Sequence, residues 1–226
     1  MADDYVDWEQ LYKDDFTPWD AKKPDSHLME LVAEKPLAPC RVLDLGCGTG
    51  TNAIWLAKQG FEVTATDLSE TALKLAYAKE DSGLCTFIYA DFLKESVPGT
   101  DFKFIFDLGC FHGLGKKEDR ALFARKAAEC LMDEGLWLSV SGSTDGPEFG
   151  PPRLSACDIT AAAEPCFEIL SLKATELDEV EKDDHDELSL PPGFRIRAWV
   201  CLMRIRAGEA SEYIRNCSSK RLKKKK

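Results

Sequence analysis

The chain has 226 residues, of which 44% are hydrophobic, and its 40 acidic residues outnumber 29 basic ones to give a net charge of −11. This size and apolar content are typical of one soluble domain with a sizeable core. The acidic balance disfavours a nucleic-acid partner. No apolar run is long enough to cross a bilayer, and the acidic start lacks the apolar centre of a signal peptide. We therefore expect no membrane partner.

The nine cysteines are scattered, odd in number and without a Cys-x-x-Cys pair. This pattern favours free thiols in a reducing compartment over a disulfide framework or a zinc site. We expect a cytoplasmic protein that binds no metal. Nothing in the sequence forces an interface, so a monomer is expected.

Residues 1–39 are predicted to form an N-terminal helical segment. A short helix is expected over residues 3–14, where apolar side chains recur at helical spacing: Tyr5, Trp8, Leu11 and Tyr12. A proline-held turn at residues 16–20 separates it from a second helix over residues 26–35. Prolines at 36 and 39 end that helix.

From Cys40 onward, predicted strands alternate with predicted helices, which is the signature of βαβ units. The strands are expected at residues 41–45, 61–66, 85–90, 102–108 and 136–141. The helices are expected at residues 51–59, 69–80 and 119–132. This alternation indicates a parallel sheet covered by helices.

The chain after residue 141 completes the fold. A glycine- and proline-rich loop over 142–152 precedes Ser155 and Asp158, whose spacing resembles a capping box for a helix through residue 163. The last two strands are expected at residues 166–174 and 194–206. Apolar residues alternate in the final strand, which favours an antiparallel or edge position. The predicted fold class is therefore α/β, a Rossmann-like, doubly wound, seven-stranded and mostly parallel sheet with an antiparallel last strand, within a domain of residues 40–206.

Charge is unevenly distributed near the end of the chain. An acidic run covers residues 176–187, and lysines and arginine crowd residues 220–226. A terminal basic cluster could contact nucleic acid or anionic membrane, or serve as a nuclear address. A disordered, solvated end is the commoner outcome, and we expect it for residues 207–226.

The most informative stretch is Val-Leu-Asp-Leu-Gly-Cys-Gly-Thr-Gly at residues 42–50. An apolar strand ends in an acid, Asp44, and a glycine turn leads directly into a helix, as in turns that approach a nucleotide closely. A dinucleotide fingerprint would place its third glycine at residue 51. The acid two residues before the turn suits a cationic or zwitterionic ligand. The turn residues expected to touch the ligand are Gly46, Cys47 (through its backbone), Gly48 and Gly50.

Acids recur at the ends of the first three strands. Asp44 and Asp67 are 23 positions apart, and Asp67 and Asp91 are 24 positions apart, so each interval is one βαβ unit. All three carboxylates should converge on the carboxyl edge of the sheet, where open α/β sheets bind ligands. A carboxylate after the second strand can accept from both ribose hydroxyls, with Leu68 beside it. One after the third strand can accept from an adenine amino group, with Phe92 beside the ring. Taken singly, Asp67 could instead belong to a turn and helix cap, and Asp91 to a loop.

The segment 42–50 resembles motif I of the class I S-adenosylmethionine (SAM) methyltransferases, whose cofactor is a sulfonium with an amino-acid end. The resemblance implies SAM as cofactor and S-adenosylhomocysteine as product. Acids that match Asp67 and Asp91 hold the ribose and the adenine in that family. The three acids in register favour this cofactor interpretation over three unrelated turns.

A narrower resemblance covers the chain up to residue 152. Trp8, the Thr-Pro-Trp-Asp segment at 17–20, the Asp-Leu-Gly-Cys-Phe-His segment at 107–112 and the loop at 142–152 look like the branch of thiopurine, thiol and halide methyltransferases. In that branch the N-terminal tryptophan segment forms a lid over the cofactor. The resemblance implies that Trp19 closes the site, with Trp8 or Tyr12 near the acceptor. The alternative is that these aromatic residues pin the N-terminal helix to the core.

Methyl transfer is an in-line displacement, in which the protein aligns the acceptor and excludes water. His112 could orient or deprotonate an acceptor, although a loop histidine bonded to backbone is the commoner arrangement. Asp107 could hold His112 or meet the amino end of the cofactor. The residues expected on the acceptor side are Trp8, Tyr12, Cys110, Phe111 and Phe149, with Cys110 as a packing residue and not a nucleophile.

The leading hypothesis is a SAM-dependent methyltransferase that transfers a methyl group to a small-molecule acceptor, with sulfur (a thiol) or a related soft nucleophile as the first candidate for the accepting atom. The alternatives are an O- or N-methyltransferase of a small heterocycle, a protein or RNA methyltransferase recruited by the basic tail, and a non-catalytic scaffold. The chain lacks an Asn/Asp-Pro-Pro-aromatic tetrad at 107–110, which disfavours transfer to planar exocyclic nitrogens. Retention of all three acids disfavours the scaffold.

Overall fold

A computed structural model describes residues 6–34, 37–80, 83–146, 152–178 and 195–206. Its centre is a seven-stranded sheet in the order β3-β2-β1-β4-β5-β7-β6. The strands are β1 (Arg41–Leu45), β2 (Glu62–Asp67), β3 (Cys85–Tyr89), β4 (Phe102–Leu108), β5 (Leu131–Gly142), β6 (Phe167–Glu176) and β7 (Arg197–Ile205). Strand β7 runs opposite to the other six strands and pairs antiparallel with β5 and β6. The predicted fold class is therefore confirmed.

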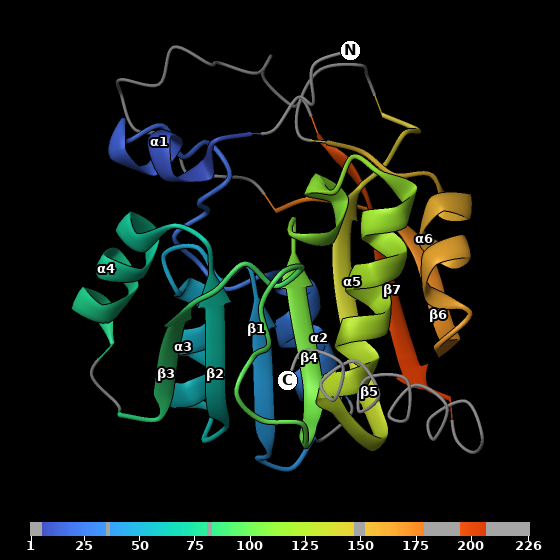
Figure 1. The fold of residues 1–226 in the computed structure, drawn as a ribbon, viewed down its shortest axis with the longest axis horizontal. Coiled ribbons are helices and arrows are strands. Elements are labelled where there is room, and N and C mark those ends of the chain that lie inside the picture. Colours follow the sequence, from blue (N-terminus) through green and yellow to red (C-terminus); the bar gives the residue numbers. More distant parts are fainter. Residues whose placement is uncertain (1–5, 35–36, 81–82, 147–151, 179–194, 207–226) are drawn as a thin grey trace, which may run out of the picture.

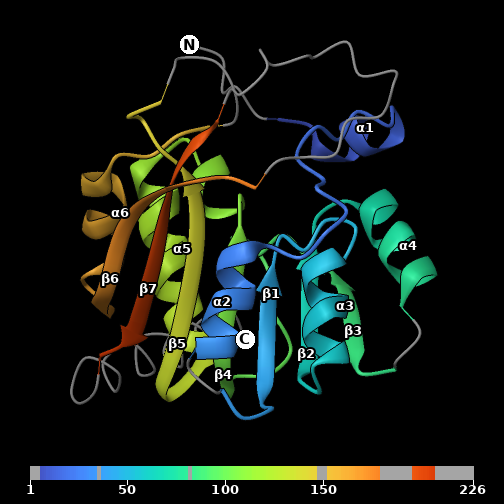
Figure 2. The same cartoon turned by 180° about the vertical axis from the view of Figure 1, so that it is seen from behind.

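Helices cover both faces of the sheet. Figure 1 shows α5 (Lys117–Cys130) and α6 (Ala156–Ala163) in front of the sheet, and Figure 2 shows α2 (Ser26–Glu34) and α3 (Thr51–Lys58) on the opposite face. The helix α4 (Glu70–Lys79) flanks β3, and α1 (Trp8–Lys13) lies above the carboxyl ends of the parallel strands. This arrangement puts α1 over the edge where ligands bind in such sheets.

Each face of the sheet has its own hydrophobic core. Strand β4 supplies both, because Phe104 and Phe106 face α2 and α3 while Ile105 faces α5 and α6. This alternation is the period of two expected of a strand covered on both sides. The α5 side is rich in aromatic rings that pack in tilted and edge-on pairs, including Phe123, Trp137 and Phe167.

The final strand β7 confirms the prediction of an antiparallel or edge position, because it is antiparallel to β5 and β6 and lies between them, with β6 at the side of the sheet. Two other features differ from expectation. Strand β5 begins at Leu131, five residues earlier than expected, and meets β4 through a register shift. A short 3-10 helix, η1 (Phe111–Gly113), follows β4 and was not predicted. The capping box at Ser155 and Asp158 is confirmed.

Several sequence predictions lie outside the described residues. These are Phe149, most of the acidic run at 176–187, and the whole basic tail at 207–226. In the part of the chain that the structure describes, no helix has both the length and the apolar character required to cross a bilayer.

Candidate active site

The glycine turn between β1 and α3 has a backbone that only glycine adopts readily. Gly46, Gly48 and Gly50 have φ values of 70°, 54° and 78°, in the left-handed region. Protein atoms also approach closely: a Cβ on Gly46 would lie 2.7 Å from Cβ of Cys110, and one on Gly48 would lie 2.7 Å from the hydroxyl of Tyr12. The turn is thus shaped to receive the loop after β4 and the N-terminal helix as well as a ligand.

Asp67 ties two loops of this edge together. Its Oδ2 accepts the Gly48 amide at 2.8 Å, and its Oδ1 accepts the Ser69 amide at 2.9 Å. Burial raises the pKa of Asp67, and these amide donors oppose that rise. Ser69 in turn caps α4, because its hydroxyl accepts the amide of Ala72 at 3.0 Å. Asp67 and Ser69 therefore do form a turn and a helix cap. These bonds hold the Asp67 carboxylate at the carboxyl edge of the sheet, where a ribose would have to bind. Leu68 is half-buried beside it.

Asp44 is the buried acid of the carboxyl edge that lacks a hydrogen-bond partner for one of its oxygens. Its side chain is only 2% exposed, and its Oδ2 has no hydrogen-bond partner. Burial, followed by the charges of Asp107 and Asp67, raises the pKa of Asp44 to about 8. A buried carboxyl oxygen among other acids fits a cationic ligand group, which is the property that a SAM site requires. Within the described residues, no group of three or more His, Cys, Asp or Glu side chains is arranged to hold a metal ion.

Asp107 is fully buried at the end of β4. It accepts the Phe111 amide at 2.9 Å through Oδ1 and the Trp137 indole at 3.0 Å through Oδ2. Burial raises its pKa to about 6, against the lowering effect of these donors. The suggestion that Asp107 holds His112 is wrong, because its oxygens bind the backbone of η1 and the indole of β5.

His112 is a backbone-bonded loop histidine. Its Nδ1 accepts the amide of Gly142 at 2.6 Å, and its side chain is 7% exposed. Burial lowers the pKa of His112 to about 4, so the ring is neutral at pH 7. An accepting Nδ1 requires the proton on Nε2, which makes the ring a donor at that nitrogen. Nδ1 is therefore not available to deprotonate an acceptor.

Two aromatic residues assigned to the site belong instead to the core. Phe111 is 0% exposed and packs between Phe123 and Trp137 at centroid distances of 5.6 and 5.3 Å, so its assignment to the acceptor side is corrected. Phe92 is 6% exposed and meets Phe123 at 4.9 Å. Its ring faces the core on the α5 side instead of lying open beside an adenine.

The last predicted site residues at the carboxyl edge are Asp91, Cys47 of the glycine turn and Cys110 of the loop after β4. Asp91 accepts the Leu93 amide at 3.0 Å and pairs with Lys94 at 2.7 Å. Partial burial acts to raise its pKa, but the hydrogen bond and charge of Lys94 outweigh it and leave the pKa below its usual value. Cys47 and Cys110 are half-buried free thiols, and burial raises the pKa of each well above its usual value. Neither is a thiolate at pH 7.

The N-terminal segment places a cluster of three aromatic rings over the edge. Trp19 meets Trp8 and Tyr12 edge-on at centroid distances of 5.3 and 5.8 Å, and its indole donates to the Tyr12 hydroxyl at 3.1 Å. Tyr12 is buried against Gly48, whereas Trp19 is 37% exposed. Trp8 lies near Gly113 of η1. The cluster thus bridges the glycine turn and the loop after β4.

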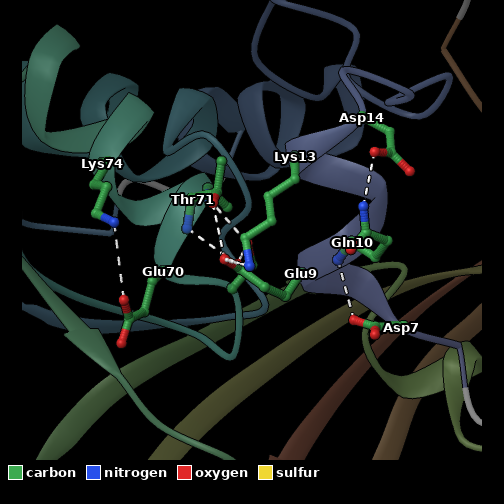
Figure 3. Close-up of polar contacts among 10 residues, drawn as sticks. Asp7, Glu9, Gln10, Lys13, Asp14, Glu70, Thr71 and Lys74 are labelled. Carbon is green, nitrogen blue, oxygen red and sulfur yellow. Dashed lines mark hydrogen bonds and ion pairs between the residues drawn. The ribbon is translucent and has the colours of Figure 1, made fainter.

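Glu9 of α1 is a contact that the sequence analysis missed. Its carboxylate accepts the Ser69 hydroxyl at 2.6 Å, the Thr71 amide at 3.1 Å and the Thr71 hydroxyl at 2.9 Å, at the start of α4. Lys13 lies 3.2 Å away on the same helix (Figure 3). The hydrogen bond from Ser69 is the largest cause that lowers the pKa of Glu9 to about 2. Unsatisfied amides at a helix start attract a carboxylate, but no local pattern pairs residue 9 with residue 71.

A second contact holds the N-terminal segment to the glycine turn and to α4. The Thr49 hydroxyl donates to Asp20 at 2.8 Å and accepts from Lys79 at 2.7 Å. Asp20, Thr49 and Lys79 also line a groove of about 640 Å³ between the N-terminal segment and the helices α3 and α4. Asp44 and Asp107 do not line that groove, so it adjoins the acidic edge without being part of it.

The comparisons with known proteins agree with this geometry. Residues 3–190 match the family model of thiopurine S-methyltransferase (TPMT). The chain is 30% identical over 176 residues to "Probable thiol methyltransferase 2" of Arabidopsis thaliana, which covers 75% of this chain and 77% of that protein. It is 30% identical over 149 residues to thiocyanate methyltransferase 1 of Brassica oleracea, covering 64% and 65% respectively. A solved structure described as "Conversion of a Disulfide Bond into a Thioacetal Group during Echinomycin Biosynthesis" superposes with a TM-score of 0.73 at 22% identity, covering 93% of this chain and 96% of that one.

The strand order, the glycine turn and the acidic carboxyl edge, together with these matches, define a SAM-dependent methyltransferase. The chain belongs to the thiopurine S-methyltransferase family. The predicted family, enzyme class and cofactor are therefore confirmed.

Proposed function

We propose that this methyltransferase acts on a small soft nucleophile, with a thiol as the first candidate and thiocyanate or halide as close relatives of it. The named relatives are a thiol and a thiocyanate methyltransferase, which supports this class of acceptor. The observation that carries the proposal is the bond from the Gly142 amide to Nδ1 of His112. A neutral ring with this nitrogen occupied is poorly suited to remove the proton of a hydroxyl acceptor. A thiolate or an inorganic anion has no proton to remove.

Different residues of the carboxyl edge would bind different parts of the cofactor. When bound, the cofactor supplies a methyl group activated by a sulfonium. Asp44 and the turn of Gly46, Cys47 and Gly48 would meet the amino-acid end. Asp67 would accept from the ribose, since each of its oxygens keeps a lone pair beyond its amide bond. Asp91 would meet the adenine.

The acceptor would enter beside the aromatic cluster. Trp8, Tyr12 and Trp19 exclude water from the edge and are both a lid and an anchor for α1. The Nε2–H group of His112 is a donor that can orient an anionic acceptor. Cys110 contributes packing against Gly46. These roles make residues 6–34 a cap on the catalytic domain.

The cellular setting follows from the thiols. All eight cysteines in the described ranges are free, which supports a reducing compartment, and we propose the cytoplasm. We also propose a monomer, because the edge is assembled from one chain.

The test measures methyl transfer from labelled SAM to a small thiol, thiocyanate, iodide, a thiopurine and a hydroxylated heterocycle. We expect turnover of the first three. At saturating cofactor, kcat/KM for the thiol should rise with pH as the thiolate fraction grows, while that for thiocyanate and iodide should stay flat. Efficient turnover of the hydroxylated heterocycle alone, or of protein or RNA alone, would overturn the proposal.

A further inference from the structure

The carboxyl groups of Asp44, Asp67 and Asp107 lie on three neighbouring strands at the carboxyl edge, and they differ in how many hydrogen bonds they accept from the protein. Asp67 and Asp107 each accept two hydrogen bonds from protein donors. Asp44 lies on β1, between the strands that carry the other two, and its buried Oδ2 accepts none. A buried, unpartnered carboxylate is strongly disfavoured, and such a group takes up a proton instead.

The surroundings of Asp44 offer it no compensating charge. Among the described residues, the charges that act most on it are Asp107 on β4 and Asp67 on β2, and both raise its pKa. The remaining titratable groups that sense Asp44 or Asp67 are the thiols Cys47, Cys85 and Cys110, the phenol of Tyr12 and the carboxylate of Glu9. All of these are neutral or negative. Lys94 pairs with Asp91 after β3, two strands away from Asp44, so among the described residues no cation compensates Asp44.

We propose that Asp44 is protonated in the cofactor-free enzyme and releases its proton when the ammonium of the amino-acid end of SAM binds against Oδ2, so that cofactor capture is coupled to proton release. The O–H bond of the Asp44 carboxyl breaks, the proton passes to solvent, and the carboxylate pairs with the ligand cation. This step rests on the cofactor lying at this edge, as assigned above.

The coupling has a quantitative signature. With a free-state pKa of about 8, Asp44 is mostly protonated at pH 7, whereas Asp107, with a pKa of about 6, is mostly ionised. Asp44 is therefore the main source of the proton. Affinity should then rise roughly tenfold per pH unit between the bound-state and free-state pKa values of Asp44.

The experiment is calorimetric titration of S-adenosylhomocysteine, which keeps the ammonium, at pH 7 in buffers of different ionisation enthalpy. We expect release of about one proton, and a Kd that falls roughly tenfold from pH 6 to pH 7. In Asp44→Asn the buffer dependence should vanish while weaker binding persists. Glu70→Gln is the control, because Glu70 is exposed on α4, pairs with Lys74 and has no part in the proposed cofactor site, so proton release and Kd should stay as in wild type.

A second probe isolates the ligand group. Methylthioadenosine has neither the ammonium nor the sulfonium, and we expect it to bind without releasing a proton. The proposal is overturned if the wild-type enthalpy is the same in every buffer with a pH-independent Kd, or if methylthioadenosine releases the proton as well. If Asp44→Asn fails to fold, the wild-type pH series and the two ligands still decide the matter. Absence of any wild-type binding would instead count against the cofactor site itself.

Discussion

Glu9 and Thr71 lie 62 positions apart in the chain, yet the carboxylate of Glu9 accepts both the amide and the hydroxyl of Thr71 at the start of α4. The contact joins the helix that covers the active site to the helix that follows Asp67. It places a negative charge where the amides of α4 are unsatisfied, which is the favourable end of a helix for an anion. Closure of the N-terminal segment is therefore partly electrostatic.

Glu9→Gln should loosen the N-terminal segment. The pKa of Glu9 falls from 4.5 to about 2 on folding, so its contribution is fully present above pH 4.5 and is lost as the pH falls towards 2. Because Glu9 is partly exposed, we expect a loss of only about 1 kcal/mol. Limited proteolysis near residue 20 should be faster in the variant at pH 7, and its difference from wild type should shrink as the pH falls from 4.5 towards 2.

Glu70→Gln is the matched control for Glu9. Glu70 also lies in the first turn of α4, but it is exposed and pairs only with Lys74 at 3.8 Å (Figure 3). Proteolysis should be unchanged in this variant. Equal acceleration by both substitutions would attribute the effect to general loss of negative charge near the start of α4.

Gly48→Ala should damage the site through one identifiable clash. The new Cβ would lie 2.7 Å from the Tyr12 hydroxyl, whereas the next ring atom, Cζ, is 3.9 Å away. We expect loss of cofactor affinity and a stability loss beyond the ~1 kcal/mol of left-handed strain. Tyr12→Phe removes the clashing oxygen, so the double variant should recover about 1 kcal/mol relative to additivity. Chemical denaturation and calorimetry of all four proteins measure this.

Gly83→Ala separates strain from collision. Gly83 has a φ of 69°, similar to that of Gly48, but an added Cβ would meet no atom within 4 Å. This variant should show the strain alone, with cofactor affinity intact. A Gly48→Ala protein no less stable than Gly83→Ala would refute the role given to Tyr12.

The titration of His112 should make the free energy of unfolding depend on pH, and it should leave the rate of methyl transfer unaffected. Its folded-state pKa of about 4 lies below the usual 6.5, so its contribution is complete above pH 6.5 and is lost as the pH falls through 4. The full effect is roughly 3 kcal/mol. His112→Asn keeps an acceptor for the Gly142 amide, whereas His112→Ala leaves that buried amide unpaired. Denaturant unfolding at pH 4, 5.5 and 7 should show a shallower pH dependence in both variants and lower stability at pH 7 in His112→Ala.

The kinetics of the same two variants check the role of the ring. With thiocyanate as acceptor, His112→Asn should keep kcat within about tenfold of wild type, because no proton has to be removed. A loss of about a thousandfold in a folded His112→Asn protein would instead make the ring a catalytic group.

Asp67→Asn should weaken both the fold and cofactor binding. Asparagine has one acceptor oxygen for the two amides of Gly48 and Ser69, so one amide loses its partner at a cost of about 1–3 kcal/mol. Affinity for S-adenosylhomocysteine should fall at least tenfold. Asp91→Asn keeps an acceptor oxygen for the Leu93 amide and loses only the charge pair with the exposed Lys94, so its melting temperature should stay near wild type. Comparable melting temperatures for the two variants would contradict this account of Asp67.

Much of the fold was predictable because it rests on local patterns. Strand and helix periodicity located all seven strands, and the 23- and 24-residue spacing placed Asp44, Asp67 and Asp91 at one edge of a parallel sheet. The capping box at Ser155 was also predictable from the sequence, because its two partners are three residues apart. These features depend on interactions between near neighbours in the chain or on the fixed geometry of βαβ units.

The active-site details depend on distant partners, and here local pattern fails. An aromatic residue after a strand can face the edge or the core, and packing against Phe123 turned both Phe92 and Phe111 inward. The proton position on His112 is set by an amide 30 residues away, and the partner of Asp107 is Trp137 on the next strand. The sequence alone determined the architecture and which acids gather at its edge, because these follow from periodicity and chain spacing. Only the tertiary structure decided which of those acids is satisfied, since burial and hydrogen bonding arise when remote segments meet.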